Sequence, residues 1–201
     1  MRKKDEEKMA TAAVNLVVAF SGVEKGVFEK VTSFNSQNCM TEDTEIIIVG
    51  TITPTEGMKN GYYYTAPRNR IYGYIDAARG TSLVKKKTDL MQEPLSKKRK
   101  QIISEVKNEL KEQKIAFLDV MGSAIRRKGS HADSDIKCYT LDYSAFSTIQ
   151  ENVKKVICNS KLAEYCYNII RTKILNLPVA TYLSQRNGTR ERWIKELGQI
   201  T

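Results

Sequence analysis

Four short runs of apolar and β-branched residues divide the chain, and longer amphipathic segments separate them. The runs are Glu45–Val49, Ile115–Val120, Lys155–Cys158 and Lys173–Leu177. Continuous apolar runs of this length are typical of strands that are buried on both faces of a parallel sheet. We therefore expect four strands at these positions.

The segments between the runs place apolar residues at i, i+3, i+4 and i+7, which is the spacing of a buried helix face. This spacing predicts helices over Arg70–Ala78, Lys98–Lys111, Tyr143–Val153 and Lys161–Ile170. Strands that alternate with helices imply right-handed crossovers between parallel strands. The expected fold is therefore α/β, a three-layer α/β/α sandwich with a central four-stranded parallel sheet.

The N-terminal segment has a different pattern. Residues 1–32 show helical spacing, and a polar loop is expected at residues 34–38. We expect an N-terminal helical extension over residues 1–39 and an α/β domain over residues 40–201. A signal peptide is the alternative for the apolar stretch Met9–Phe20, but acidic residues precede it where a signal peptide carries positive charge. A helix packed on the domain is the favoured interpretation.

The segment Thr81–Lys100 is expected to be a linker between two crossover helices. It carries two basic runs, Lys85–Lys87 and Lys97–Lys100, on either side of Pro94. Charge runs of this kind usually form a solvated, mobile surface segment.

The 201-residue chain is basic, with 33 Lys and Arg against 23 Asp and Glu, which gives a net charge of +10. A surplus of this size suits a polyanionic partner such as nucleic acid, although many basic proteins bind none. No apolar run approaches the roughly 20 residues that span a bilayer. The four cysteines form no CxxC pair, which indicates a reduced intracellular protein without a zinc site. We expect a cytoplasmic, nucleoid-associated monomer.

The chain carries few of the groups that nucleophilic or metal-dependent catalysis needs. Its one histidine, His131, lies in a Gly-Ser turn and is expected at the surface. Neither a phosphate-binding GxxxxGK(S/T) loop nor a GxGxxG turn after a strand is present. Catalysis would have to use Asn, Asp, Thr, Tyr and backbone amides, which favours reactions that depend on positioning and electrostatics.

The strongest candidate for a binding site is the stretch Ile46–Arg70, IIIVGTITPTEGMKNGYYYTAPRNR. A buried strand ends at Gly50 and enters a polar turn with Thr51, Thr53 and Pro54, and three tyrosines follow. Ligands of open α/β sheets bind at the carboxyl ends of the strands. The aromatic and amide groups of this loop suit a flat, polar ligand such as a nucleobase.

Three segments resemble motifs of the uracil-DNA glycosylase superfamily, in the order found in its mismatch-specific and hypoxanthine (deoxyinosine) DNA glycosylase branch. The first is VGTITP with GYYYTAPRNRIYGYID, the second is IAFLDVMGSAIRRKGSHADSDI and the third is KKVICNSKLAEYCY. The resemblance implies an α/β/α sandwich and hydrolysis of the N-glycosidic bond of a deaminated base, uracil or hypoxanthine. Such enzymes flip the base out of the stack. The implied partner is DNA, duplex with a damaged base or single-stranded, and no metal or cofactor is implied.

The resemblance also implies catalytic roles for two residues, Asn69 and Asp119. Asn69 matches an asparagine implicated in catalysis in the hypoxanthine branch, and it would equally suit capping the helix that begins near Arg70. Asp119 stands at a strand end, where it would act as a base or orient Ser123 or Arg126. Capping is again the alternative.

The implied base-binding residues are Gly50, Thr51, Thr53, Pro54 and Tyr64. Tyr64 matches the aromatic residue that stacks on the flipped base, and ordinary hydrophobic packing is the alternative for the three tyrosines. Gly50 would let the backbone approach the base closely.

Contacts with DNA are expected from Arg68, Ser123, Arg126 and Arg127, from Leu183 as a wedge, and from Ser184, Arg186 and Asn187 in place of the family's serine-rich last motif. The chain departs from the family at Ile52, where the mismatch-specific branch has a water-activating asparagine, and at Val179–Thr181, where serines are expected. These departures leave open a nucleic-acid or nucleotide-binding protein without hydrolysis. A hydrolase of free nucleotides or nucleosides is a third hypothesis.

Overall fold

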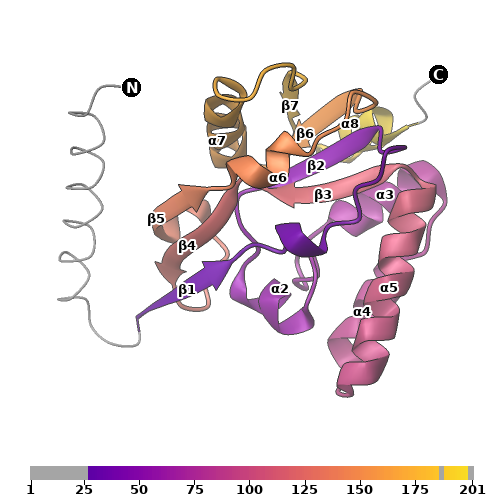
Figure 1. Ribbon diagram of the computed structural model, residues 1–201. Helices are drawn as coiled ribbons and strands as arrows, with labels where there is room; N and C mark the ends of the chain where they lie inside the picture. The colour runs from indigo at the N-terminus through magenta and orange to yellow at the C-terminus, as the bar shows by residue number, and fades with distance from the viewer. Residues whose placement is uncertain (1–26, 186–187, 199–201) are drawn as a thin grey trace.

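A four-stranded parallel sheet with strand order β3-β2-β6-β7 forms the centre of the computed structural model (Figure 1). The structure describes residues 27–185 and 188–198. The strands are β2 (Ile46–Gly50), β3 (Ile115–Asp119), β6 (Lys155–Cys158) and β7 (Ala180–Tyr182). Every residue of β2 and β3 is buried, as expected for strands with both faces covered. The first three predicted strands are therefore confirmed.

The predicted fourth strand, Lys173–Leu177, is wrong. These residues form turns, with Asn176 at φ 70° and Leu175 83% exposed. The fourth strand is β7, which lies at the edge of the sheet next to β6. Its three residues are only half-buried, so it lacks the apolar run by which a central strand is recognised.

Helices flank the sheet and complete the predicted three-layer α/β/α sandwich (Figure 1). Three predicted helices are confirmed as α3 (Ile71–Arg79), α5 (Ser96–Glu112) and α7 (Lys161–Arg171). The helix α8 (Arg190–Leu197) packs against α3, and α7 packs against β6 and β7.

The predicted helix Tyr143–Val153 is too long, because α6 (Tyr143–Ser147) ends after five residues. Its start is set by Asp142, whose Oδ1 accepts a hydrogen bond from the backbone N–H of Ala145 at 3.1 Å. A further short helix, α2 (Thr55–Asn60), follows β2 closely and ends at Gly61, which has a left-handed conformation with φ 87°.

The predicted linker Thr81–Lys100 is also wrong, because α4 (Leu83–Gln92) occupies half of it and packs against α5. The buried residues of α4 are Leu83, Lys87 and Leu90, which lie at i, i+4 and i+7. A lysine at the middle position of this buried face hides the helical spacing in the sequence.

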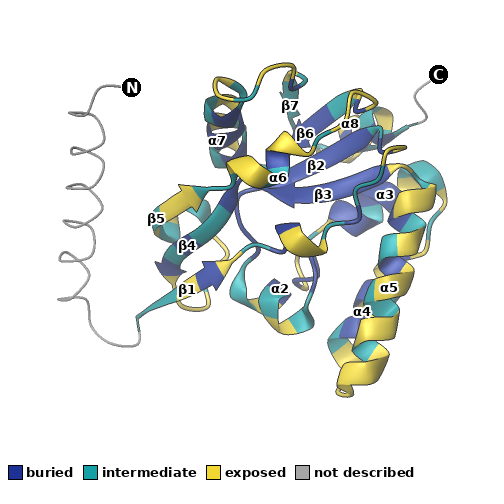
Figure 2. Cartoon of the chain, in the orientation of Figure 1, coloured by how far each residue is buried: buried dark blue, intermediate teal, exposed yellow. Residues whose placement is uncertain are grey.

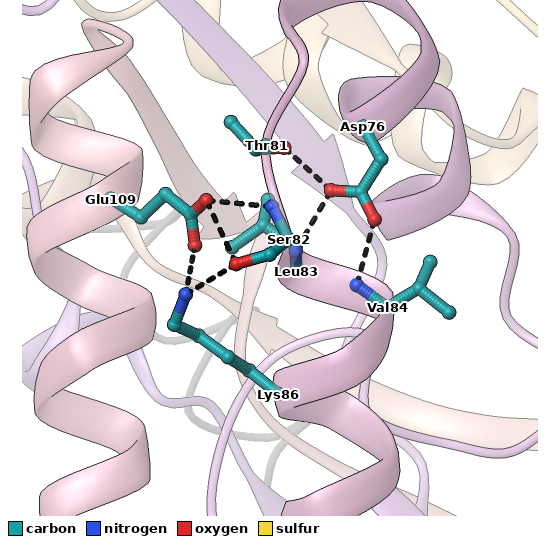
Figure 3. A network of polar contacts seen from close by, with 7 residues as sticks. All are labelled: Asp76, Thr81, Ser82, Leu83, Val84, Lys86 and Glu109. Atoms are coloured by element: carbon teal, nitrogen blue, oxygen red, sulfur yellow. Dashed lines mark hydrogen bonds and ion pairs between the residues drawn. The ribbon is translucent and has the colours of Figure 1, made fainter.

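The α4–α5 helix pair, residues 83–112, is held to α3 by a polar network around the start of α4 (Figure 3). Asp76 of α3 accepts a hydrogen bond from the backbone N–H of Leu83 at 2.8 Å. Glu109 of α5 accepts from the backbone N–H of Ser82 at 2.7 Å and pairs with Lys86 at 2.6 Å. Carboxylates from the neighbouring helices therefore take the place of a local cap, since the Ser82 side chain makes no capping bond.

A second sheet, which the sequence pattern does not predict, has the antiparallel strand order β1-β4-β5. Its strands are β1 (Phe28–Thr32), β4 (Met121–Arg127) and β5 (Ile136–Leu141). The strand β4 begins two residues after β3 ends, so the chain passes from the parallel sheet directly into this one. Its burial is interrupted by half-buried and charged positions, so it shows no continuous apolar run.

The helical expectation for residues 1–32 is wrong for β1, which pairs with β4 from Phe28 opposite Arg127 to Thr32 opposite Ser123. The part of the expected extension at residues 1–26, including the apolar stretch from Met9, lies outside the described residues. Val31, Phe34 and Cys39 are buried in the same core as β2 and β3.

The core lies between the parallel sheet and its helices, and the exposed residues lie on the outer faces of the helices (Figure 2). All four cysteines are free, and Cys39, Cys158 and Cys166 are buried. Among the described residues, no helix has the length and apolar character needed to cross a membrane.

Candidate active site

A cavity of about 650 Å³ opens at the carboxyl edge of the parallel sheet. Its wall includes Gly50 and Asp119, the last residues of β2 and β3, and Asn159, which directly follows β6. Ligand pockets typically measure about 300–1,000 Å³. The cavity therefore has the size and the position in the fold that suit a nucleotide-sized ligand.

The cavity brings together all of the residues that the sequence predicts to bind a base or act on it. These residues are Gly50, Thr51, Thr53, Pro54, Tyr64, Asn69 and Asp119. The predicted DNA contact Arg68 lies in the same wall and is exposed. Their roles stay predictions, but their convergence is a property of the fold, because Asp119 is 50 residues or more from the others in the sequence.

Two predicted DNA contacts are corrected by their burial. Arg126 is 1% exposed and Leu183 is 2% exposed, so neither side chain is available to a phosphate or to a base stack. The strand β4 directs Arg126 inward, where the carboxylates of Asp133 and Glu29 balance its charge. Leu183 belongs to the hydrophobic core.

Three further predicted DNA contacts, Ser123, Arg127 and Ser184, do not line the cavity. The hydroxyl of Ser123 is 3.0 Å from that of Thr140 on the antiparallel sheet, and Arg127 is exposed at the end of β4. The carbonyl of Ser184 accepts a hydrogen bond from the indole N–H of Trp193 at 2.8 Å. Arg186 and Asn187 lie outside the described residues, and contacts of these residues with DNA stay predictions.

Asp119 is a buried carboxylic acid in the cavity wall, with 2% of its surface exposed. Its Oδ2 accepts two hydrogen bonds from Thr53, from the backbone N–H at 2.9 Å and from the hydroxyl at 3.0 Å. Its Oδ1 lies beside Gly50, 2.8 Å from the point that a Cβ atom there would occupy. One oxygen is therefore held by the loop after β2, and the other is directed toward the end of β2.

Burial raises the pKa of Asp119 to about 7, and the negative charge of Asp133 adds to this effect. The two hydrogen bonds from Thr53 and the positive charge of Arg126 act in the opposite direction but do not cancel it. A carboxyl group with a pKa near neutrality can both accept and release a proton under physiological conditions.

Tyr64 places its hydroxyl next to the same carboxylate. The Tyr64 Oη lies 3.0 Å from the Cβ position of Gly50, and it has no hydrogen-bond partner in the described part of the chain. Burial and then the charge of Asp119 raise the pKa of Tyr64 well above its ordinary value, so this hydroxyl stays protonated. Gly50 is required here because any side chain would collide with both groups.

Tyr64 is fixed by its backbone and by its ring. It has a positive φ of 55°, which is uncommon for a residue other than glycine, and its ring packs edge-on against Phe117 with centroids 4.8 Å apart. Strained backbone of this kind is concentrated at functional sites. The predicted stacking role stays a prediction, and packing against Phe117 accounts for one edge of the ring.

Asn69 lies two residues before the start of helix α3 and lines the cavity. Its Oδ1 accepts a hydrogen bond from the backbone N–H of Ile71 at 3.0 Å, which is the capping role that the sequence left as the alternative. Its Nδ2 group has no hydrogen-bond partner among the residues that the structure describes. The side chain therefore serves the helix with its oxygen and can offer its amide N–H groups to a ligand.

Lys87 of α4 holds the loop that carries Asn69, and no sequence signal identifies it. Its Nζ donates to the carbonyl of Pro67 at 3.1 Å and to that of Asn69 at 2.8 Å. The lysine is buried, and this desolvation lowers its pKa. The buried Lys87 ammonium group thus binds two loop carbonyls, and these hydrogen bonds hold Asn69 in its position in the cavity wall.

Asn35 supports Asp119 from behind the cavity. Its Oδ1 accepts from the backbone N–H of Asp119 at 2.8 Å and from the hydroxyl of Tyr63 at 2.8 Å. Its Nδ2 donates to the carbonyl of Asp119 and to Oδ2 of Asp142, each at 2.8 Å. The sequence places Asn35 in a polar loop and gives no indication that it reaches β3.

Two polar residues of the cavity wall were missed although a sequence signal for each exists. Asn159 follows the buried run Lys155–Cys158, as the Thr51 turn follows β2, so the strand-end rule would have found it. Asp133 accepts a hydrogen bond from the Thr51 hydroxyl at 2.8 Å, and it lies in the motif-like segment IAFLDVMGSAIRRKGSHADSDI.

His131 lies at the rim of the cavity, where its Nε2 is 3.1 Å from Oε2 of Glu56. It is exposed, as the sequence predicts. In the ranges that the structure describes, no group of three or more His, Cys, Asp or Glu residues could hold a metal ion. The cavity wall offers the carboxyl group of Asp119 and the amide groups of Asn69 and Asn159.

Comparison with known proteins supports the fold. No family model matches the sequence, and no curated protein matches it. A solved structure that is similar to this chain is the solution NMR structure of a candidate uracil DNA glycosylase from Methanosarcina acetivorans, with a TM-score of 0.55 and 20% sequence identity. The similarity covers 80% of this chain and 92% of that one. At this identity the likeness concerns the fold.

Proposed function

We propose that this protein is a DNA glycosylase, which hydrolyses the N-glycosidic bond of a deaminated base, uracil or hypoxanthine, after the base is flipped into the cavity. The observation that carries the proposal is the placement of the Asp119 Oδ1 and the Tyr64 hydroxyl beside Gly50, 2.8 and 3.0 Å from its Cβ position, in residues that line a cavity large enough for a base. The fold of a protein that is named as a candidate uracil DNA glycosylase and the net charge of +10 support it.

Amide side chains suit deaminated bases for a simple chemical reason. Deamination creates a carbonyl beside a ring N–H in both uracil and hypoxanthine, and an amide offers a donor and an acceptor at the matching spacing. Asn159 presents such a group at the end of β6, and Asn69 adds donor N–H groups. Flipping is least costly for a mispaired base, which favours deaminated bases over normal ones.

The reaction itself transfers the deoxyribosyl group from the base to water. The bond between C1′ and the base nitrogen breaks, and its electron pair leaves with the base, whose negative charge the amide N–H groups of Asn69 and Asn159 stabilise. The oxygen of a water molecule forms the new bond to C1′, and its proton passes to ionised Asp119. The products are an abasic sugar and the free base, which takes up a proton.

In this scheme Asp119 activates the water molecule, which is the role that an asparagine at the position of Ile52 has in the mismatch-specific branch. Ile52 lies in the cavity wall, and its hydrocarbon side chain has no group that could activate water. The carboxylate arrives instead from β3, which is the neighbour of β2 and ends at the same edge of the sheet. The apolar Ile52 wall also favours the second candidate, a protein that binds nucleic acid or nucleotides through this cavity without hydrolysing them.

Strand scission separates these two functions. Duplex and single-stranded oligonucleotides with one uracil or one hypoxanthine are incubated with the protein, and abasic sites are then cleaved with alkali. We expect scission at the lesion with at least one base and a large loss of scission in Asn69→Ala. Binding to the same oligonucleotides without scission of any of them would refute the glycosylase and support the binding protein.

A further inference from the structure

Five cations form a group at the start of α5 and the end of α2, which we call the hairpin-tip surface: Lys59, Lys97, Lys98, Arg99 and Lys100. All of them are exposed except Arg99, which is half-buried. The four residues in α5 are one of the two basic runs in the sequence, and the parallel sheet and its cavity do not use them.

The hairpin-tip surface adjoins the cavity through α2. The Arg99 guanidinium donates a hydrogen bond to the carbonyl of Lys59 at the end of α2. One turn of the chain closer to the sheet, Glu56 and Gly57 of the same helix line the cavity. The cavity and the surface therefore share one short helix.

The positive charge of the surface is only slightly neutralised by the protein. In the described part of the chain, its ion pairing is a single 3.9 Å contact between Lys98 and Glu93. Lysines elsewhere pair more closely, as Lys86 does with Glu109 at 2.6 Å and Lys114 with Glu45 at 2.9 Å. The charges at the tip of the α4–α5 pair are thus available to an external anion.

The position of these charges within α5 does not stabilise the helix. They occupy its first turns, which contain no acidic residue, although the N-terminus of a helix favours negative charge. Stability of the fold therefore does not explain the basic run. The negative charge of a bound polyanion would offset the repulsion between these lysines and the positive end of the helix dipole.

The α4–α5 pair is anchored to the rest of the fold by polar contacts. Figure 1 shows the two helices side by side, projecting beyond the sheet. Carboxylates of Asp76 and Glu109 fix the start of α4 (Figure 3), and Lys87 ties its inner face to the loop of Asn69. The distance between the tip and the cavity is therefore set by the fold.

We infer that the hairpin-tip surface binds the phosphate backbone of duplex DNA beside the nucleotide whose base enters the cavity. This inference rests on the proposed function for the identity of the base, but not for the contact itself. Lysine and arginine contacts with phosphates position a duplex without reading its sequence. They release counterions, so that affinity falls steeply with salt concentration.

Fluorescence anisotropy with a labelled, undamaged DNA duplex tests this surface, with the full chain and salt concentration as the variable. The tip variant carries Lys97→Gln, Lys98→Gln and Lys100→Gln. The control variant carries Lys111→Gln, Lys173→Gln and Lys195→Gln, which remove the same charge from exposed positions. Lys111 lies at the opposite end of α5, so the two variants compare both ends of one helix.

We expect the slope of log Kd against log salt to shrink by up to about 2.7 in the tip variant, since each phosphate contact contributes about 0.9. The control variant should keep a slope close to that of the original protein. A tip variant whose slope matches the control variant, or an original protein that binds duplex with no salt dependence, would overturn the inference.

Two further readouts keep the result interpretable. Thermal unfolding followed by circular dichroism should give the tip variant a Tm no lower than the original, because the removed charges oppose the helix dipole. Scission of lesion-bearing oligonucleotides is measured in parallel. Loss of binding in the tip variant of a protein that cleaves no lesion would sustain the surface while refuting the glycosylase.

Discussion

The side chain of Asn35 pairs with both sides of the Asp119 peptide: its Oδ1 accepts from the Asp119 N–H and its Nδ2 donates to the Asp119 carbonyl, each at 2.8 Å. The two bonds satisfy both backbone polar groups of Asp119, the last residue of β3. The remaining capacity of the amide is taken by Tyr63 and Asp142. Asp119 therefore owes its position to a residue 84 positions earlier in the sequence.

Replacement of Asn35 should strongly lower the free energy of unfolding. In Asn35→Ala, the buried N–H and carbonyl of Asp119 and the Tyr63 hydroxyl all lose their partner, and each unsatisfied buried group costs about 1–3 kcal/mol. We expect the free energy of unfolding in urea to fall by about 3 kcal/mol or more. Asn152→Ala is the control, since Asn152 is exposed and makes one hydrogen bond to Glu42, and it should cost less than about 1 kcal/mol. Equal losses in the two variants would contradict the importance of this contact.

The stability of the protein should depend on the ionisation of Asp119. Its pKa rises from 3.8 in the unfolded chain to about 7 in the fold, so between these values the folded state binds the proton more strongly. The stabilisation that the protonated form provides is complete below pH 4 and is lost as the pH rises through about 7. Urea unfolding of the original protein and of Asp119→Asn across this range isolates the effect, which the substitution should remove. An identical pH dependence in the two proteins would count against a raised pKa.

Gly50→Ala should close the cavity. A Cβ atom at this position would lie 2.8 Å from Asp119 Oδ1 and 3.0 Å from Tyr64 Oη, closer than such contacts normally are. We expect loss of base binding and a lower Tm. Gly73→Ala in α3 is the matched control, because its Cβ would meet only Val84 at 3.7 Å, and alanine in a helix interior is favoured over glycine by about 0.5–1 kcal/mol. A Gly50→Ala protein with unchanged binding would show that Asp119 and Tyr64 do not converge there in solution.

Lys87→Met should lower the rate of base release by displacing the loop that carries Asn69. The substitution removes a desolvated cation and keeps much of its volume, but it releases the carbonyls of Pro67 and Asn69. We expect a fall in the rate of base release of roughly tenfold or more, because misplaced groups are costly in catalysis. The exposed neighbour Lys85 provides the control, and Lys85→Met should leave the rate unchanged. An unchanged rate in Lys87→Met would mean that Asn69 needs no external support.

The part of the site that the sequence predicted lies mostly in one contiguous stretch. Gly50, Thr51, Thr53 and Tyr64 follow a buried strand at short range, so the strand-end rule and the local motif were sufficient to find them. The strands β2, β3 and β6 were found because each has a continuous run of buried apolar residues.

The residues that were missed act over long distances or break the usual pattern. Asn35 contacts Asp119 from a loop that lies 84 positions earlier in the sequence. Lys87 occupies a buried helix position where an apolar residue is expected. Arg126 was expected to contact phosphate because of its charge, and Leu183 was expected to be a wedge from its position in the segment that resembles the family's last motif, whereas tertiary packing buries both. The edge strand β7 is too short and too exposed to carry a pattern.

The most direct test of catalysis by Asp119 is single-turnover base release with enzyme in excess over an oligonucleotide that carries the excised base. The observed rate of the original protein should rise with pH through about 7, as Asp119 ionises. Asp119→Asn should bind the same oligonucleotide with similar affinity and release the base at least roughly a hundredfold more slowly, without this rise. An Asp119→Asn protein that releases the base at the original rate would contradict the role assigned to this carboxylate.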